Sequence, residues 1–238
     1  MTLAGRVAVI TGATSGIGLA TAEALSARGV KLVLHGRRRE ILEAHAARLP
    51  DCAVLAGDVG DPDTAGRLVA LALERFGRMD IAFSNAGLIA SGPAETIDLD
   101  ALSEMIRVNV DAAFRFAYTA VRHMKPAGGG HLLMTGSVLG TKVRPNAGGY
   151  CATKFAVEAL CEALRMELAG SGVKVSVVEP GLVRTDLHRD YAVRPEVAQG
   201  IPEPLLPEDV ARAVVFALEQ PAHVLVPRVM VLPAGQPA

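Results

Sequence analysis

The sequence predicts an α/β fold built on a single doubly wound parallel sheet of about seven strands, with helices on both faces. From Val7 onward, short apolar runs alternate with longer amphipathic runs, which is the pattern of parallel strands joined by covering helices. The chain has 238 residues, and α/β folds often form one unit of up to about 250 residues. We therefore expect one domain over residues 1–238.

The short apolar runs are the predicted strands, and the amphipathic runs are the predicted helices. Gly29 follows the first helix and Pro207 opens the last, as is common at helix ends. Asp61 is a candidate cap for the third helix, ahead of Pro62. The strands are expected at residues 7–11, 31–35, 52–56, 81–84, 131–135, 174–179 and 228–232. The helices are expected at residues 17–28, 39–48, 62–76, 99–124, 150–169 and 208–220.

One long segment, residues 184–207, contains several prolines and follows neither the strand period nor the helix period. Irregular segments of this length in a compact domain are usually lids or binding loops. The segment follows the sixth predicted strand, so it would lie over the carboxyl ends of the sheet, where open α/β folds bind ligands. We expect it to be a substrate lid within the single domain.

Composition argues against several classes of function. Lys and Arg number 24 against 25 Asp and Glu, and aromatic residues make up 4% with no Trp, so nucleic-acid binding is not expected. Charges interrupt every apolar window of about 18 residues, which leaves no membrane span. The first apolar run begins at Val7, so no signal peptide fits ahead of it, and we expect a cytoplasmic protein. The three cysteines and six histidines form no C-x-x-C or H-x-x-x-H pair, so we expect no metal site.

The loop between the first predicted strand and helix reads Thr11-Gly12-Ala13-Thr14-Ser15-Gly16-Ile17-Gly18. Its glycines allow a tight turn and close backbone approach to a pyrophosphate, and the helix N-terminus offers free N–H groups and a positive dipole. No Gly-Lys-Ser/Thr closes the motif, which argues against a P-loop. An ordinary strand-to-helix turn is the alternative. We predict a Rossmann-type dinucleotide site with contacts from Gly12, Thr14, Ser15, Gly16, Ile17 and Gly18.

Arginines stand at the end of the second predicted strand, where an acidic residue about 20 positions after the glycine loop would bind the ribose hydroxyls of NAD. The sequence there reads His35-Gly36-Arg37-Arg38-Arg39. A guanidinium pairs with phosphate through two hydrogen bonds, so Arg37 is the first candidate for the 2′-phosphate of NADP and Arg38 the second. We therefore expect NADP(H) to be preferred over NAD(H). The alternative is a solvated charge run at a helix start, which Arg39 is expected to be.

Tyr150 and Lys154 stand at i and i+4 of a predicted helix, so they share one face about a turn apart. A free Tyr has a pKa of about 10 and is a poor base at neutral pH. An ammonium at roughly 4 Å would favour the phenolate by on the order of 4 kcal/mol at an effective dielectric constant near 20, before the desolvation of Lys154 is subtracted. Ser137 follows the fifth predicted strand and could supply a hydroxyl at the same end of the sheet. A surface pair on a helix is the alternative.

With these residues in view, the chain resembles the short-chain dehydrogenase/reductase family over nearly its whole length. The matches run in order through the 11–18 loop, Asp58-Val59, Asn85-Ala86-Gly87, Asn109, Ser137, Tyr150, Lys154 and Pro180-Gly181 to Thr185. The resemblance implies that Tyr150 exchanges a proton with the substrate oxygen, that Ser137 holds that oxygen, and that Lys154 binds the nicotinamide ribose and lowers the Tyr pKa. It further implies a proton relay through Asn109. The cofactor contacts that it implies are Asp58 and Val59 at the adenine, Asn85, Ala86 and Gly87 along the groove, Pro180 and Gly181 leading to the site, and Val183 and Thr185 at the carboxamide.

Within that family, the chain is similar to the NADP-preferring branch of serine/3-hydroxy acid dehydrogenases and related carbonyl reductases. This implies an NADP(H)-dependent oxidoreductase that transfers a hydride between the nicotinamide and a small-molecule alcohol or carbonyl compound. One alternative is a 3-oxoacyl-[acyl-carrier-protein] reductase, although such enzymes usually end the last strand in a Gly-Gly turn that this chain lacks. A non-catalytic NADP(H)-sensing protein and an isomerase or dehydratase on the same scaffold are the others.

The substrate pocket is expected to be walled by Leu139, Asn146, Leu182 and the lid at residues 186–206. A substrate carboxylate could be held by an arginine in these loops, although loop arginines are more often solvated. The candidates are Arg144, Arg184, Arg189 and Arg194.

Two predicted helices, 99–124 and 150–169, are apolar on more than one face. A helix that is apolar all round must be covered by another partner, so we expect a homo-oligomer, a tetramer or a dimer, formed through this pair. Deeper burial within one chain is the alternative. The residues that carry this expectation are Phe114, Tyr118, Val121, Phe155, Val157, Leu160 and Leu164.

Overall fold

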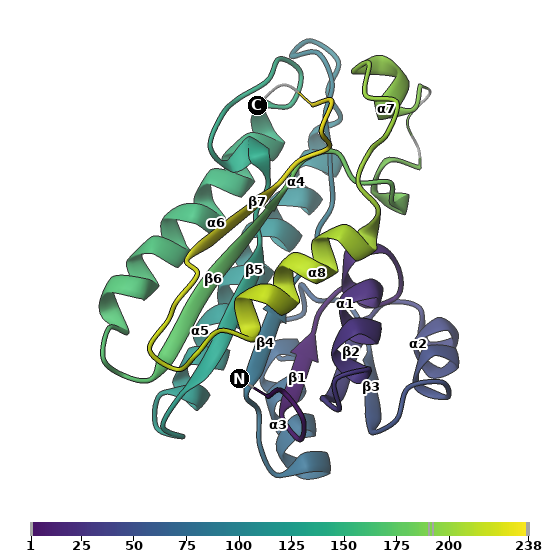
Figure 1. Cartoon of the computed structure of the whole chain (residues 1–238). Coiled ribbons are helices and arrows are strands. Elements are labelled where there is room, and N and C mark those ends of the chain that lie inside the picture. The colour runs from purple at the N-terminus through teal and green to yellow at the C-terminus, as the bar shows by residue number, and fades with distance from the viewer. Residues whose placement is uncertain (1, 190, 192, 237–238) are drawn as a thin grey trace.

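The computed structural model describes residues 2–189, 191 and 193–236. Its centre is a seven-stranded sheet in the order β3-β2-β1-β4-β5-β6-β7, and every pair of neighbouring strands is parallel (Figure 1). The chain winds outward from β1 in one direction and from β4 in the other, so the doubly wound sheet of the sequence prediction is confirmed. The strands are β1 (Val7–Ile10), β2 (Lys31–Gly36), β3 (Cys52–Ala56), β4 (Ile81–Ser84), β5 (Gly130–Thr135), β6 (Val173–Pro180) and β7 (Arg228–Val231).

Helices cover both faces of the sheet, because successive strand residues point to opposite faces and both faces are apolar. In β1, Val7 and Val9 join one core cluster with α3 (Thr64–Phe76), α5 (Ala113–Met124) and α6 (Gly148–Glu167). Ala8 and Ile10 join the other cluster, with α1 (Gly16–Ser26), α2 (Arg39–Ala46) and α8 (Pro207–Leu218). Figure 1 shows α1 and α8 lying together on one side of the sheet, with α5 and α6 on the other.

The predicted helix 99–124 is interrupted in the structure. It consists of α4 (Leu99–Ile106), a π-helical turn (Arg107–Ala112) and α5, which follow one another directly with no loop between them. A π-turn inserts one residue into the helical ladder and is frequent at functional sites. Asn109 lies within this turn and is buried. The third helix begins at Thr64 instead of residue 62, and Asp63 is its cap residue.

The expected lid segment contains short elements that sequence periodicity did not predict, namely a 3₁₀ turn (Asp186–His188) and α7 (Pro195–Ala198). Its two ends are joined at the base, where the Arg184 N–H donates to the Leu205 carbonyl at 2.8 Å and the Leu205 N–H to the Leu182 carbonyl at 2.9 Å. In Figure 1, α7 stands beyond the end of α8, clear of the sheet. In the part of the chain that the structure describes, no helix has both the length and the apolar character to cross a membrane.

Candidate functional site

A cavity of about 800 Å³ opens at the carboxyl ends of the strands, at the point where the strand order reverses between β1 and β4. It runs from the glycine loop to the start of α6 and is bounded by the segment after β6. All but two of the predicted catalytic and cofactor-binding residues line it. The two exceptions are Gly18 and Asn109, which are buried behind the wall.

The glycines of the loop before α1 are required by its geometry. Gly12 and Gly16 have φ of +68° and +57°, in the left-handed region that favours glycine. A Cβ on Gly12 would lie 2.8 Å from Ala86 Cα, and one on Gly18 would collide with the Gly12 carbonyl oxygen. The first turn of α1 carries no acidic residue, and the Ser15 side chain makes no cap hydrogen bond. The open N–H groups and the positive end of the helix dipole therefore fit the pyrophosphate of a dinucleotide.

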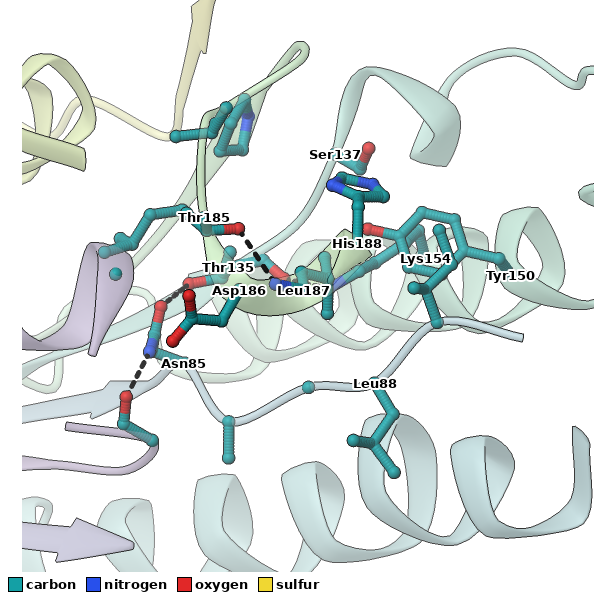
Figure 2. A pocket seen from close by; sticks show the side chains of 18 of the residues that line it. Asn85, Leu88, Thr135, Ser137, Tyr150, Lys154, Thr185, Asp186, Leu187 and His188 are labelled. Atoms are coloured by element: carbon teal, nitrogen blue, oxygen red, sulfur yellow. Dashed lines mark hydrogen bonds between the residues drawn. The ribbon is translucent and has the colours of Figure 1, made fainter. Parts of the chain in front are cut away.

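The loop after β4 is fastened to the glycine loop by side chains of Thr11 and Asn85. The Thr11 hydroxyl oxygen accepts from the N–H groups of Asn85 and Ala86 at 3.0 and 3.1 Å. Asn85 Nδ2 donates to the Thr11 carbonyl at 3.1 Å, and its Oδ1 accepts from the Thr135 hydroxyl at 3.1 Å. These bonds hold the ends of β1, β4 and β5 together, and Figure 2 shows the bond between Asn85 and Thr135.

The adenosine end of the cavity carries Arg37 and Arg38. Arg38 Nη2 donates to Thr14 Oγ1 at 2.9 Å, which holds this guanidinium against the glycine loop. Arg39 lies outside the cavity lining and pairs with Glu43 at 3.5 Å, as expected for a solvated residue at a helix start.

Asp58, also in the lining, is bound by Arg107 Nη2 at 2.6 Å from its Oδ2 and by the Gly60 N–H at 2.8 Å from its Oδ1. The hydrogen bond from Arg107 is the largest cause that holds the pKa of Asp58 below its ordinary value.

Tyr150 and Lys154 lie on one face of α6, and both side chains are buried at the cavity wall. Lys154 Nζ donates to the Thr135 carbonyl at 2.8 Å and lies 5.7 Å from the centroid of the Tyr150 ring. Ser137 is held at the end of β5, where its Oγ accepts from the Leu139 N–H at 3.1 Å. Figure 2 shows Ser137, Tyr150 and His188 together at one side of the site, with Lys154 beneath them.

The electrostatics of this group differ from the sequence expectation. Burial raises the pKa of Tyr150 to about 12, and a hydrogen bond with Ser137 only partly opposes this rise. Lys154 is not among the groups that shift the pKa of Tyr150. Burial lowers the pKa of the Lys154 ammonium itself to about 8, and this ammonium donates a hydrogen bond to the Thr135 carbonyl. Tyr150 therefore keeps its proton at neutral pH, which is the form that can donate a proton to an oxygen.

Asn109 is placed to join elements behind the cavity wall. Its Oδ1 accepts from the Leu88 N–H at 2.8 Å, and its Nδ2 donates to the Leu88 carbonyl at 2.9 Å and to Thr153 Oγ1 at 3.2 Å. The π-helical turn thus ties the segment after β4 to α6, one residue before Lys154.

A family model described as short chain dehydrogenase matches residues 6–194, which is most of the chain. The chain belongs to the short chain dehydrogenase family. Members of this family are oxidoreductases, and the glycine loop, the 85–87 segment and the Ser137, Tyr150 and Lys154 group described above all fall within the matched region.

Curated relatives of this short chain dehydrogenase include bacterial and fungal proteins. An uncharacterized oxidoreductase of Staphylococcus saprophyticus is 34% identical over 97% of this chain and 97% of its own length. The glycine betaine reductase of Emericella nidulans is 36% identical over 99% of this chain, but the chain spans only 19% of the length of that protein.

Three solved structures are similar to this short chain dehydrogenase. An alcohol dehydrogenase from the archaeon Thermococcus sibiricus, complexed with 5-hydroxy-NADP, has a TM-score of 0.88 and 31% identity and covers 98% of both chains. The closed form of serine dehydrogenase complexed with NADP+ has a TM-score of 0.92 and 27% identity over 98% of this chain and 97% of that chain. A 3-ketoacyl-(acyl-carrier-protein) reductase from Brucella melitensis, complexed with NADH, has a TM-score of 0.88 and 28% identity over 98% of both. The protein is therefore an NAD(P)-dependent oxidoreductase with a small-molecule substrate.

At the substrate end of the short chain dehydrogenase site, Leu139 and Leu182 line the cavity as expected, but Asn146 does not. Asn146 instead adopts φ of +62° in a turn, and its carbonyl accepts from the Gly92 N–H at 2.8 Å. Of the four candidate arginines, Arg144 and Arg189 line the cavity, whereas Arg184 and Arg194 do not.

The sequence analysis did not single out several residues of the site, among them Thr135 and Gln236, and it included His188 only as part of the lid expected at residues 186–206. Thr135 contributes its carbonyl to Lys154 and its hydroxyl to Asn85. His188 reaches the cavity from the 3₁₀ turn of the lid segment, and Gln236 Oε1 accepts from the Leu182 N–H at 2.8 Å. For Thr135, its place at the end of a predicted strand was an available signal, since polar residues there face the site. His188 and Gln236 lie outside any periodic pattern.

Proposed function

We propose that the protein is an NADP(H)-dependent oxidoreductase that interconverts a small-molecule alcohol and its carbonyl compound, with Tyr150 as general acid and base. The observation that carries this proposal is a single cavity that joins a protonated Tyr150, beside Ser137 and Lys154, to a glycine loop flanked by Arg37 and Arg38. When bound, the nicotinamide supplies or accepts the hydride. The protein groups must then orient the substrate oxygen and move one proton.

In the reduction direction, Tyr150 donates its proton to the oxygen that gains negative charge, and Ser137 holds that oxygen in place. Lys154 binds the ribose next to the nicotinamide and gives positive charge near Tyr150. Asn109 positions the segment after β4 against α6. It would also anchor a water that continues a proton relay from Lys154. In the oxidation direction the same groups act in reverse, with Tyr150 accepting the proton of the alcohol.

The cofactor contacts follow the cavity lining. Gly12, Thr14, Ser15, Gly16 and Ile17 would bind the pyrophosphate, with Gly18 behind them allowing the close packing. Asp58 and Val59 would contact the adenine, and Arg37 and Arg38 the 2′-phosphate. The nicotinamide half would lie along Asn85, Ala86, Gly87, Pro180, Gly181, Val183 and Thr185.

We propose that residues 184–207 form a lid over the substrate. Both ends of this segment are fixed by the bridge between Val183 and Leu205, and Tyr191 OH lies 2.5 Å from Ser91 Oγ in the segment after β4. His188, packed edge-on to Tyr191 with ring centroids 5.2 Å apart, reaches into the cavity from the same segment. A lid held in this way would exclude water from the reacting atoms.

The test is a screen of NADPH oxidation over aldehydes, ketones, 3-oxo acids and 3-oxoacyl thioesters, with NADH in parallel. Tyr150→Phe removes the proton donor and should lower turnover by at least about 10²-fold, the ordinary range for loss of a general acid, while NADPH binding is retained. Tyr118→Phe on the exposed surface of α5 is the matched control and should keep full activity. Turnover by Tyr150→Phe near that of the control would contradict the proposal.

A further inference from the structure

Two carboxyl groups are buried behind the catalytic face and share one guanidinium. The side chains of Glu158 on α6 and Glu179 on β6 are 5% and 2% exposed. Arg228 on β7 reaches both, with Nη2 3.1 Å from Glu158 Oε2 and Nε 3.4 Å from Glu179 Oε1. Buried carboxylates are costly unless they are paired, and here two of them have one cation between them. We call Glu158, Glu179 and Arg228 the carboxylate cluster.

The carboxylate cluster lies beside the backbone that presents Ser137, Tyr150 and Lys154. Glu158 lies one helical turn after Lys154 and two turns after Tyr150, on the same face of α6. It packs so closely on Gly136, the residue before Ser137, that a Cβ there would collide with Glu158 Oε1. Glu179 directly precedes Pro180 and Gly181, which line the cavity. A change in the charge of the cluster should therefore change the pKa of Lys154.

Glu158 faces few other ionisable groups. They are Glu179 from β6, Arg228 from β7, and Lys154 and Cys161 from α6 itself. The turn Val138–Gly140 also packs against Glu158, through Gly140, and it has no charged side chain. Burial and the neighbouring Glu179 raise the pKa of Glu158, and Arg228 opposes that rise.

Glu158 is the charged neighbour that favours the cationic form of Lys154. The polar partner of its ammonium is the Thr135 carbonyl, a neutral group, and burial lowers the pKa of Lys154. The carboxylate of Glu158 acts in the opposite direction and raises that pKa. Among the residues that the structure describes, no acidic residue forms a salt bridge with Lys154 that would raise its pKa in place of Glu158.

We infer that Glu158, held between Arg228 and Glu179, is a positioning residue that keeps Lys154 in its cationic form while Tyr150 transfers its proton. This inference rests on the proposed function of Lys154. Glu158 acts through Lys154 and the Gly136–Ser137 backbone and does not itself touch substrate or cofactor.

The first test compares Glu158→Gln with Glu162→Gln in the full chain. The two variants make the same change one turn apart on α6, and Glu162 is exposed. In Glu158→Gln the loss of the negative charge should move the alkaline limb of the pH profile of kcat for carbonyl reduction to lower pH, by roughly half a pH unit or more. The alkaline limb should not move in Glu162→Gln. Glu158→Asp keeps the negative charge, so its alkaline limb should lie close to that of the unmodified protein. A lower kcat at every pH with an unmoved limb would show a merely structural role and overturn the inference.

The second test measures Lys154 directly, without turnover or cofactor. The chain has only five lysines, so the ε-carbon NMR signals of ¹³C-lysine-labelled protein can be followed with pH, and a Lys154→Arg variant identifies the signal of interest. The midpoint for Lys154 should fall in Glu158→Gln and stay unchanged in Glu162→Gln. An equal midpoint in both variants would overturn the inference.

The two tests separate this inference from the proposed function. A lowered Lys154 midpoint in a protein that turns over no carbonyl compound would support the charge coupling and contradict the proposed activity. Should Glu158→Gln fail to fold, Glu158→Met removes the same charge with an apolar side chain of similar length, and Arg228 keeps Glu179 as its ion-pair partner. The half-exposed Arg228 can then be solvated, and the same fall in midpoint is expected.

Discussion

Among single residues, the arginines beside the glycine loop differ in how they are held. Arg38 is tied to Thr14 and approaches Ser15 Oγ at 3.4 Å, so its guanidinium is already directed at the loop. Arg37 is exposed at the cavity edge, and its positive charge contributes to the lowered pKa of Asp58. Arg37 and Arg38 both line the cavity where we propose that the adenosine ribose binds, so either guanidinium could bind its 2′-phosphate, whereas Arg39 lies outside the cavity lining.

We predict that Arg37→Asp weakens NADPH binding on the order of 10- to 100-fold, because a charge-assisted hydrogen bond to the phosphate is worth about 1.5–3 kcal/mol. NADH binding should change far less, since NADH has no 2′-phosphate. Fluorescence titration with each nucleotide measures both constants. Arg39→Asp makes the same charge change just outside the cavity and should leave the NADPH to NADH ratio unaltered. Equal losses for both nucleotides in Arg37→Asp would contradict the assignment.

The chemistry of this site could be predicted from the sequence wherever residues lie close together along the chain. The glycine loop and the Tyr150 and Lys154 pair have fixed spacings, so local geometry places them. The pKa of Tyr150 could not be predicted in this way, because it depends on burial by residues far away in the sequence. Gln236 and His188 are part of the site only because the chain returns to it after β7 and through the lid segment.

Among the elements, the strands were predictable almost residue by residue, since each is a short apolar run covered on both faces. Strands β3 and β4 have the predicted bounds, β6 is one residue longer at each end, and the other four differ by one residue at one end. The π-helical turn within the predicted helix 99–124 was not predictable, because its apolar pattern continues without a Gly or Pro to mark the change. The short α7 was missed because the lid segment follows no period.

The contact between Tyr191 and Ser91 gives the lid segment its own prediction. Tyr191→Phe and Ser91→Ala each remove one partner of a hydrogen bond worth about 0.5–1.5 kcal/mol, so each should raise the KM for the carbonyl substrate about 2- to 10-fold. NADPH binding should be unchanged, because neither residue lines the cavity proposed for the cofactor. The double variant should lose no more than either single one, and a double-mutant cycle measures this. Additive losses would mean that the two side chains act separately.

At the scale of the whole molecule, buried histidines make the free energy of unfolding depend on pH. His131 on β5 lies 2.8 Å from Ser176 Oγ through its Nε2, and the Ser176 hydroxyl donates to the Val226 carbonyl at 2.6 Å. Because the Ser176 hydroxyl donates its one hydrogen bond to the Val226 carbonyl, His131 Nε2 must be the donor in its contact with Ser176 Oγ. Burial lowers the pKa of His131 to about 3. The folded protein therefore holds this ring neutral at pH values where the unfolded chain protonates it.

We predict that the free energy of unfolding falls between pH 7 and pH 5 and that His131 accounts for about 2 kcal/mol of the fall. The folded pKa is below the unfolded value of about 6.5, so stability is full above that value and is lost as the pH drops below it. Urea denaturation at both pH values measures the loss. His131→Asn should reduce the loss by that amount, whereas His223→Asn, in an exposed turn, should not. Equal losses in both variants would rule out this role for His131.

Part of the apolar surface expected to drive self-association is used within one chain. Val121, Val157, Leu160 and Leu164 are buried in the core with at most 8% exposure, whereas Tyr118 and Phe155 remain 41% and 42% exposed. The homo-oligomer stays a prediction that now depends on these two exposed side chains of α5 and α6. Light scattering should give the mass of a dimer or tetramer, and Phe155→Glu should reduce it. A monomer mass for the unmodified protein would reject the prediction.

The bridge between Val183 and Leu205 has a consequence for how new specificities could arise on this scaffold. The bridge closes the segment between these two residues into a loop whose two ends are held together. Insertions, deletions or replacements inside that loop therefore need not change the register of β6 or the start of α8. Replacing the whole segment between Val183 and Leu205 by that of a homologue should therefore change the substrate specificity, while the residues that transfer the proton and bind the nucleotide remain in place.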